Sequence, residues 1–260
     1  MHPNFRLVFL TAAMTSAAIP AVAQAELVGI TAEEAFDAVQ TQTDPLTGAH
    51  ANVALVDVRT RAEYFWVGTA AKVNKITLRD AKSQSIVPDL GKVKLLDEGK
   101  FLEYAVNGRH KRTQVDKVAS LDTSPIAINV PYKLWDEATA TTSSNQDFDG
   151  DIDALADAGA EVLIVYCRSG SRSSTCGTQI DEEKKFQAVY EIDDPVPGSA
   201  GGVGGFEGSP YGEVYNGYHG FPGRLTDVQS VPSVSWKDTG LPIKIGVNPL
   251  NNTPPLPWNK

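Results

Sequence analysis

The chain has 260 residues and a formal net charge of −9, with 32 acidic residues against 23 lysines and arginines. That length allows one large domain or two small ones, and the acidic charge argues against nucleic acid and anionic membranes as partners. No long apolar segment follows residue 25, so we expect no membrane insertion by the rest of the chain.

The first 25 residues contain the three parts of a secretory signal peptide in the usual order. Arg6 supplies a positive charge, residues 7–22 are apolar or small, and residues 23–25 (Ala-Gln-Ala) match a cleavage site. We therefore expect a periplasmic or secreted protein. Removal of residues 1–25 takes away Arg6 and no acidic residue, which changes the net charge from −9 to −10.

The following chain alternates between strand and helix patterns. Short apolar runs rich in β-branched residues predict strands at residues 51–58, 126–130, 161–166 and 188–192. Capping boxes and helical spacing predict helices that begin at residues 31–34 and 60–63, or that cover residues 132–137, 151–158 and 173–186. This alternation predicts an α/β fold with an open, mostly parallel sheet covered by helices on both faces.

Two stretches interrupt the alternation. Within residues 70–125, two short strand patterns at 91–96 and 101–106 flank a glycine-bearing turn, which predicts a small β-hairpin. Residues 194–235 are rich in glycine, proline and tyrosine and predict a long loop. The C-terminal tail, residues 246–260, is proline-rich and is expected to be either extended and docked or loose.

A cysteine follows the strand predicted at residues 161–166 and precedes the helix predicted at 173–186. Ligands of open α/β sheets bind at such carboxyl ends of strands, and a helix N-terminus with nearby cations stabilises a thiolate. Small residues let the backbone curl around the sulfur, and glycine reaches positive φ at no steric cost. The predicted loop consists of Cys167, Arg168, Ser169, Gly170, Ser171 and Arg172.

At these residues the chain resembles the rhodanese (sulfurtransferase) family. The matching segments, in the family's order, are Val56-Asp-Val-Arg59 with Glu63-Tyr64, Ala127-Ile-Asn-Val-Pro131, Val165 to Ser173, Gly204-Gly-Phe206, Trp236 and Gly240-Leu-Pro-Ile243. The resemblance implies a domain over residues 26–245 with about five parallel strands, and a persulfide on Cys167. It implies that the sulfur donor is bound by Arg168, Ser169, Gly170, Ser171, Arg172 and Ser173.

The chain departs from the family pattern in two ways. Gly68-Thr69-Ala70 stands where the family usually has Gly-His-Ile. Insertions at about residues 70–125 and 207–235 separate the matching segments, and both are expected to reshape access to Cys167. For that reason the natural substrate is not carried over from the family.

The predicted reaction is sulfur transfer in two steps without a metal or other cofactor. Cys167 takes a sulfur atom from thiosulfate or a polysulfide, and a thiol or cyanide acceptor, which can be a protein, then removes it. Arg168 and Arg172 are expected to attract and orient the anionic donor. Two solvated surface arginines are the alternative interpretation.

Two other functions remain open at this stage. One is a non-catalytic sulfur carrier or partner-binding module, in which the insertions form a docking surface. The other is a cysteine phosphatase or arsenate reductase, whose loops resemble this one but have five residues between cysteine and arginine. Here only four residues separate Cys167 from Arg172, Ser173 follows, and Tyr166 stands before the cysteine in place of histidine. These differences favour sulfur transfer.

Asp57 and Arg59 follow the strand at residues 51–58, at the same end of the sheet as Cys167. We expect them to support the site by hydrogen bonds that fix its loops and by a salt bridge with Glu63. A direct contribution to the pocket is the alternative. Cys176 is expected to be a small buried helix residue rather than a resolving cysteine, because a bridge to Cys167 would close a very short loop.

Two weaker patterns lie outside the cysteine loop. Residues 145–153 space oxygen ligands like a calcium loop, but Ala156 stands where that loop ends in glutamate. The alternative is an acidic loop in which Asp151 caps the following helix. Residues 109–112 (Arg-His-Lys-Arg) form a basic cluster, interpreted as the solvated end of the insertion.

Overall fold

The computed structural model describes residues 27–79, 85–86, 93–96, 100–106, 108–168, 170–192, 236, 239, 241–248 and 256. The signal peptide predicted at residues 1–25 and the long loop predicted at 194–235 lie outside these residues, as does most of the proline-rich tail. Among the described residues, no helix is long and apolar enough to cross a membrane.

The centre of the fold is a sheet of five strands in the order β1-β13-β12-β2-β9, and all four neighbouring pairs are parallel. Its strands are β1 (Val28–Ile30), β13 (Ala188–Ile192), β12 (Val162–Tyr166), β2 (Val53–Asp57) and β9 (Ala127–Asn129). Every residue of β12 and β2 is buried, as expected for parallel strands covered on both faces. The α/β class and the five parallel strands are therefore confirmed.

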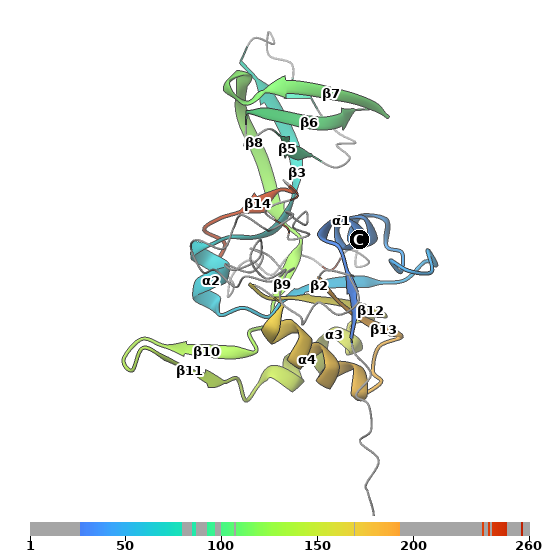
Figure 1. Cartoon of the computed structure of the whole chain (residues 1–260), viewed down its shortest axis with the longest axis vertical. Helices are drawn as coiled ribbons and strands as arrows, with labels where there is room; N and C mark the ends of the chain where they lie inside the picture. The colour runs from blue at the N-terminus through green and yellow to red at the C-terminus, as the bar shows by residue number, and fades with distance from the viewer. Residues whose placement is uncertain are drawn as a thin grey trace, which may run out of the picture.

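Helices cover both faces of this sheet (Figure 1). On one face, α1 (Ala32–Thr41) packs its buried residues, such as Phe36, in a cluster with Leu55 and Ile164. On the other face, α3 (Phe148–Asp157) and α4 (Ser171–Glu182) form a second cluster with the intervening residues of the same strands. Both apolar clusters arise from the period-two alternation of side chains along β2 and β12.

The two predicted capping boxes both form. Thr31 caps α1 through reciprocal hydrogen bonds with Glu34. Thr60 caps α2 (Arg61–Trp66) in the same way with Glu63. The second box fixes the start of α2 immediately after β2, and thereby places Glu63 at the carboxyl end of the central sheet.

The first insertion is larger than the predicted hairpin. Its base is a long antiparallel ribbon of β3 (Thr69–Leu78) and β8 (Val118–Pro125), and β4 (Ser85–Ile86) and β14 (Ile243–Lys244) also pair with β3. A 3₁₀ turn (Val115–Lys117) precedes β8. Beyond the ribbon lies a three-stranded sheet, which we call the distal sheet, of β5 (Lys94–Leu96), β6 (Phe101–Val106) and β7 (Arg109–Gln114). The predicted hairpin is its β5–β6 pair.

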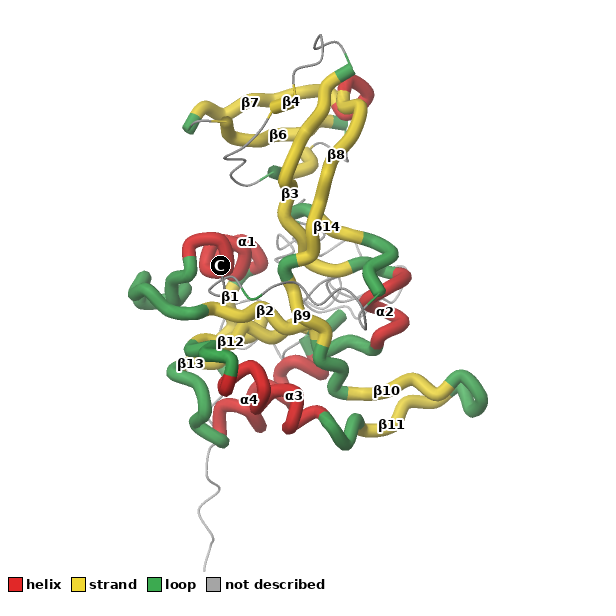
Figure 2. Tube along the Cα trace, turned by 180° about the vertical axis from the view of Figure 1, so that it is seen from behind, coloured by secondary structure: helices red, strands yellow, loops and turns green. Residues whose placement is uncertain are grey.

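The distal sheet and the ribbon share a small apolar core, apart from the two clusters of the central sheet. Its buried members are Val73, Ile76, Val93, Leu102 and Tyr104. In both views the ribbon extends away from the central sheet and carries the distal sheet at its far end (Figures 1 and 2). The small hairpin predicted from sequence was therefore only one part of a separately packed β unit.

The helix predicted at residues 132–137 is wrong. The segment forms β10 (Lys133–Asp136), which pairs antiparallel with β11 (Thr141–Ser144). The Asp136 carboxylate accepts hydrogen bonds from the Ala138 N–H and the Thr139 hydroxyl and so closes a turn. Aspartate competes with helix formation in this way, and the β-branched threonines that follow favour a strand. The hairpin projects from the side of the molecule (Figure 2).

Candidate active site at the carboxyl end of the central strand

Cys167 immediately follows β12, the middle strand of the central sheet, and is only 1% exposed. The Ser173 hydroxyl lies 3.5 Å from its Sγ and 2.8 Å from the Gly170 carbonyl oxygen. Ser173 is itself fully buried. A hydroxyl is thus held within hydrogen-bonding reach of the sulfur by the backbone of the same loop.

Gly170 is the residue that turns the loop into helix α4. Its φ of 92° is unfavourable for residues with a side chain, which explains the glycine at this position. The Ser174 N–H donates to its carbonyl oxygen at 2.9 Å, so the helix begins at Ser171, two residues earlier than predicted. The helix N-terminus therefore lies close to Cys167 in the chain, as an anion-stabilising loop requires.

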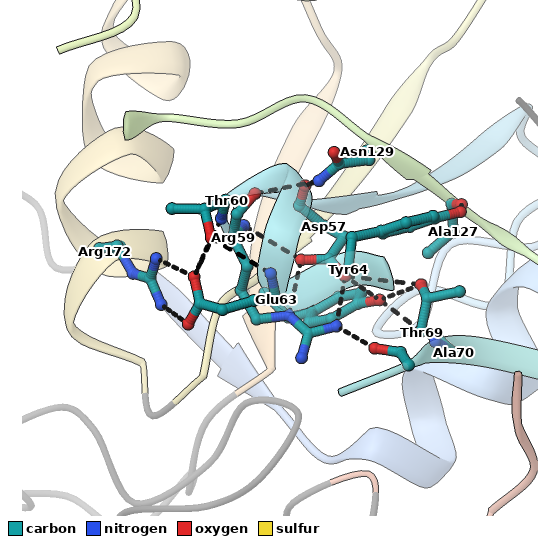
Figure 3. A network of polar contacts seen from close by, with 12 residues as sticks. Asp57, Arg59, Thr60, Glu63, Tyr64, Thr69, Ala70, Ala127, Asn129 and Arg172 are labelled. Carbon is teal, nitrogen blue, oxygen red and sulfur yellow. Dashed lines mark hydrogen bonds and ion pairs between the residues drawn. The ribbon is translucent and has the colours of Figure 1, made fainter. Parts of the chain in front are cut away.

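The structure brings Arg172 to the loop and pairs it with Glu63. The two side chains form a bidentate ion pair with both nitrogen–oxygen distances at 2.7 Å, and they are only 21% and 25% exposed (Figure 3). Burial alone would raise the pKa of Glu63, but hydrogen bonds and charge from Arg172 lower it to about 2. Much of the positive charge of Arg172 is therefore already compensated by Glu63.

For the other loop residues, the structure gives the exposure of Arg168 and Ser171. Arg168 is exposed, directly after the cysteine, and Ser171 is exposed at the first position of α4. Ser169 lies outside the described residues. Of the residues predicted to bind the donor, Ser173 contacts the cysteine and Gly170, and Arg172 is held by Glu63.

The predicted salt bridge between Arg59 and Glu63 does not form. Arg59 instead pairs with Asp57, to which its Nε donates at 2.9 Å and its Nη2 at 2.6 Å. Both side chains are fully buried, and Arg59 also donates to the Gly68 carbonyl oxygen. Burial opposes the charged form of Arg59, but the Asp57 carboxylate more than offsets this and raises the arginine pKa. The pair fixes the loop after β2, in agreement with the structural role expected for it.

Tyr166 is the residue that sequence reasoning missed. Its hydroxyl donates to Asp57 Oδ2 at 3.0 Å and shares a 2.9 Å hydrogen bond with the Thr69 hydroxyl, while the Ala70 N–H donates to it at 3.3 Å. The Arg59 guanidinium lies 5.6 Å from the centre of its ring. Burial, followed by the Asp57 charge, raises the pKa of this tyrosine. Tyr166 thus joins the end of β12, one residue before Cys167, to β2 and to the base of β3.

Three further hydrogen bonds complete this polar network (Figure 3). The Asn129 side-chain amide donates to the carbonyl oxygens of Asp57 and Arg59 at 2.9 and 3.0 Å. The Tyr64 hydroxyl donates to the Ala127 carbonyl oxygen at 2.9 Å and joins α2 to β9. Polar groups from β2, β9, β12 and α2 therefore hold the carboxyl end of the sheet in one arrangement.

Cys176 is buried in α4, as expected for a small helix residue. Its thiol lies 3.5 Å from the Ser173 carbonyl oxygen. Burial, followed by the proximity of Cys167, raises its pKa. Both cysteines are free thiols in this structure.

The segment that resembles a calcium loop is mostly helical, because α3 begins at Phe148. The N-cap is Asp147 rather than the predicted Asp151. Asp149 accepts from the Gln179 side chain and Asp153 pairs with Lys185, so both carboxylates contact other side chains. Among the described residues no group of three or more metal-ligating side chains gathers. The segment therefore lacks the loop that would wrap an ion.

A scan against protein-family models finds no match, and no curated protein matches the chain. Among solved structures, the chain is similar to the crystal structure of Rv0390 from M. tuberculosis, at 20% sequence identity. The alignment covers 82% of this chain and 95% of that one, with a TM-score of 0.36. A likeness this weak supports no conclusion about fold or activity.

Proposed function

We propose that the chain is an exported rhodanese-like sulfurtransferase. In this proposal, it moves a sulfane sulfur from thiosulfate or a polysulfide to a thiol or cyanide through a persulfide on Cys167. One observation carries the proposal: Cys167 immediately follows the middle strand of a five-stranded parallel sheet and precedes a short glycine turn and the N-terminus of α4. That position combines a nucleophile with a site that stabilises negative charge.

The proposed first step transfers sulfur to the enzyme. The Cys167 thiolate attacks the outer sulfur of thiosulfate and forms a new S–S bond. The S–S bond of the donor breaks, and sulfite leaves with the electron pair of that bond. In the second step, cyanide or an acceptor thiolate attacks the outer sulfur of the persulfide, and Cys167 leaves as a thiolate. Atoms and electrons balance in both steps without a cofactor, and ping-pong kinetics follow from the covalent intermediate.

The residues of the loop take different roles in this proposal. The Ser173 hydroxyl turns its single hydrogen from the Gly170 carbonyl oxygen, 2.8 Å away, to the thiolate, 3.5 Å away, and Gly170 permits the turn from which α4 begins. We assign the attraction of the anionic donor to both arginines: Arg168 is exposed, and Arg172 adds positive charge near the sulfur while it pairs with Glu63.

Intact-mass measurement after thiosulfate treatment tests the proposal. We expect wild type and Cys176→Ser to gain one sulfur atom, and Cys167→Ser to gain none. Cyanide should then remove the sulfur and yield thiocyanate. If wild type gains no sulfur from thiosulfate or from polysulfide, Cys167 is not a sulfur carrier.

The burial of Cys167 favours a second candidate, a sulfur carrier that serves one dedicated protein. A sulfur atom of a residue that is 1% exposed is poorly accessible to acceptors in bulk solution. A persulfide that forms but is not turned over by cyanide or by small thiols would support this carrier function. Hydrolysis of an aryl phosphate that depends on Cys167 would instead support phosphatase chemistry.

A further inference from the structure

The first insertion carries a net charge opposite in sign to that of the rest of the chain. Residues 70–125 hold eleven of the 23 lysines and arginines but only seven of the 32 acidic residues. This segment thus has a net charge of +4, and subtracting it from −9 leaves −13 on all other residues. Such charge asymmetry between parts of one chain indicates that the positively charged segment binds a negatively charged partner.

The positive charge is concentrated on β7. Arg109, His110, Lys111 and Arg112 are consecutive and exposed, and the His110 side chain is 81% exposed. His110 lies 3.9 Å from Glu103, and Arg112 lies over the ring of Phe101. Neither Arg109 nor Lys111 takes part in an ion pair with the described part of the chain. Among the described residues, the charges of Arg109 and Lys111 are therefore not compensated by an ion pair.

β7 is also an edge strand. It pairs with β6 along its whole length and stands last in the order β5-β6-β7 of the distal sheet, and no described strand pairs with its other edge. In the views of Figures 1 and 2 it lies at the far end of the ribbon, away from the central sheet. An open edge presents backbone donors and acceptors at the spacing that an added strand requires.

The register of the β6–β7 pair shows how an added strand would meet the charges. Arg109 and Lys111 share a face with Val106 and Tyr104, whereas His110 and Arg112 lie on the opposite face. Side chains of a neighbouring strand lie about 5 Å from those directly opposite. An acidic strand would therefore meet a basic side chain on both of its faces. Pairing of β7 with a second β7 would instead place like charges together.

We infer that the outer edge of β7 binds an extended acidic segment of a partner protein by strand addition. The six residues of β7 span about 20 Å, which matches a segment of about six residues. Backbone hydrogen bonds supply the geometry, and carboxylates opposite Arg109 and Lys111 supply the selectivity. This inference is independent of the chemistry at Cys167.

A labelled peptide of alternating glutamate and threonine tests the inference by fluorescence anisotropy on the full chain. We expect saturable, salt-sensitive binding that weakens about tenfold in Arg109→Thr with Lys111→Thr, since threonine preserves strand propensity. Lys133→Thr with Lys184→Gln removes the same charge outside the insertion and should bind as wild type does. Unchanged circular dichroism and unfolding midpoints would show that the variants fold.

Three results would overturn the inference. The first is the absence of saturable binding by wild type at low salt. The second is undiminished binding of the same peptide with every backbone nitrogen methylated, which keeps the charge but removes the hydrogen-bond donors of both edges. The third is tighter binding of a DNA oligonucleotide or of phosphatidylglycerol vesicles, which would assign the edge to another polyanion. Loss of binding on methylation would support strand addition.

Discussion

Replacement of Glu63 by glutamine tests the ion pair that joins α2 to the start of α4. The pair is bidentate at 2.7 Å, and its side chains are less than one third exposed. The pKa of Glu63 falls from an ordinary 4.5 to about 2 when the chain folds. With about 1.4 kcal/mol for each tenfold change in proton affinity, the carboxylate contributes about 3 kcal/mol of stability at neutral pH.

The sign of this contribution predicts its pH dependence. A carboxylate whose pKa is lowered by folding stabilises the protein fully above its unfolded pKa and loses that effect as the pH falls through the folded pKa. For Glu63 the window runs from pH 4.5 down to about pH 2. By pH 3, about 2 kcal/mol of the contribution should be lost.

Urea unfolding at pH 7 and at pH 3 measures this effect as a difference between variants. Glu63→Gln should be about 2–3 kcal/mol less stable than wild type at pH 7 and about 1 kcal/mol less stable at pH 3. Glu137→Gln, which changes an exposed carboxylate, serves as the matched control. If the difference between wild type and Glu63→Gln is the same at both pH values, the proposed ion pair does not hold Glu63 in solution.

Three other substitutions probe the network beneath Cys167 and the turn after it, each measured by urea unfolding at pH 7. Tyr166→Phe should cost about 1–3 kcal/mol, because Asp57 loses a buried donor at 3.0 Å; a neutral result would mean that water replaces the hydroxyl. Arg59→Leu should cost about 3–5 kcal/mol, because it leaves the Asp57 carboxylate buried without its cation, and a smaller loss than for Tyr166→Phe would contradict the assigned pairing. Gly170→Ala should cost about 1–3 kcal/mol because of its φ of 92°, and an unaffected midpoint would show that the turn relaxes.

The central sheet could be predicted from sequence because its strands are short, apolar and β-branched. β2, β9, β12 and β13 all fall within the predicted ranges, and these ranges also place Cys167 correctly at a strand end. The edge strand β1 has only three residues, too few for a periodic pattern to be recognised.

The insertion and the ion pairs could not be predicted in the same way. The strand β7 carries four basic residues with no apolar alternation, so its strand state depends on pairing with β6 rather than on its own pattern. The contact between Glu63 and Arg172 joins residues 109 positions apart. Because the buried Arg59 and the half-buried Arg172 lie near the same carboxylates, only the folded geometry decides the pairing. In the sequence, only the position of Tyr166 directly before Cys167 indicated that it belongs to the site.

The account depends most directly on whether Cys167 carries sulfur. Intact mass of the full chain, taken before thiosulfate, after thiosulfate and after subsequent cyanide, measures this in one experiment. We predict a gain of one sulfur atom that cyanide reverses, that Cys176→Ser retains and that Cys167→Ser lacks. A gain that persists in Cys167→Ser, or no gain by wild type with either thiosulfate or polysulfide, would contradict the proposed function.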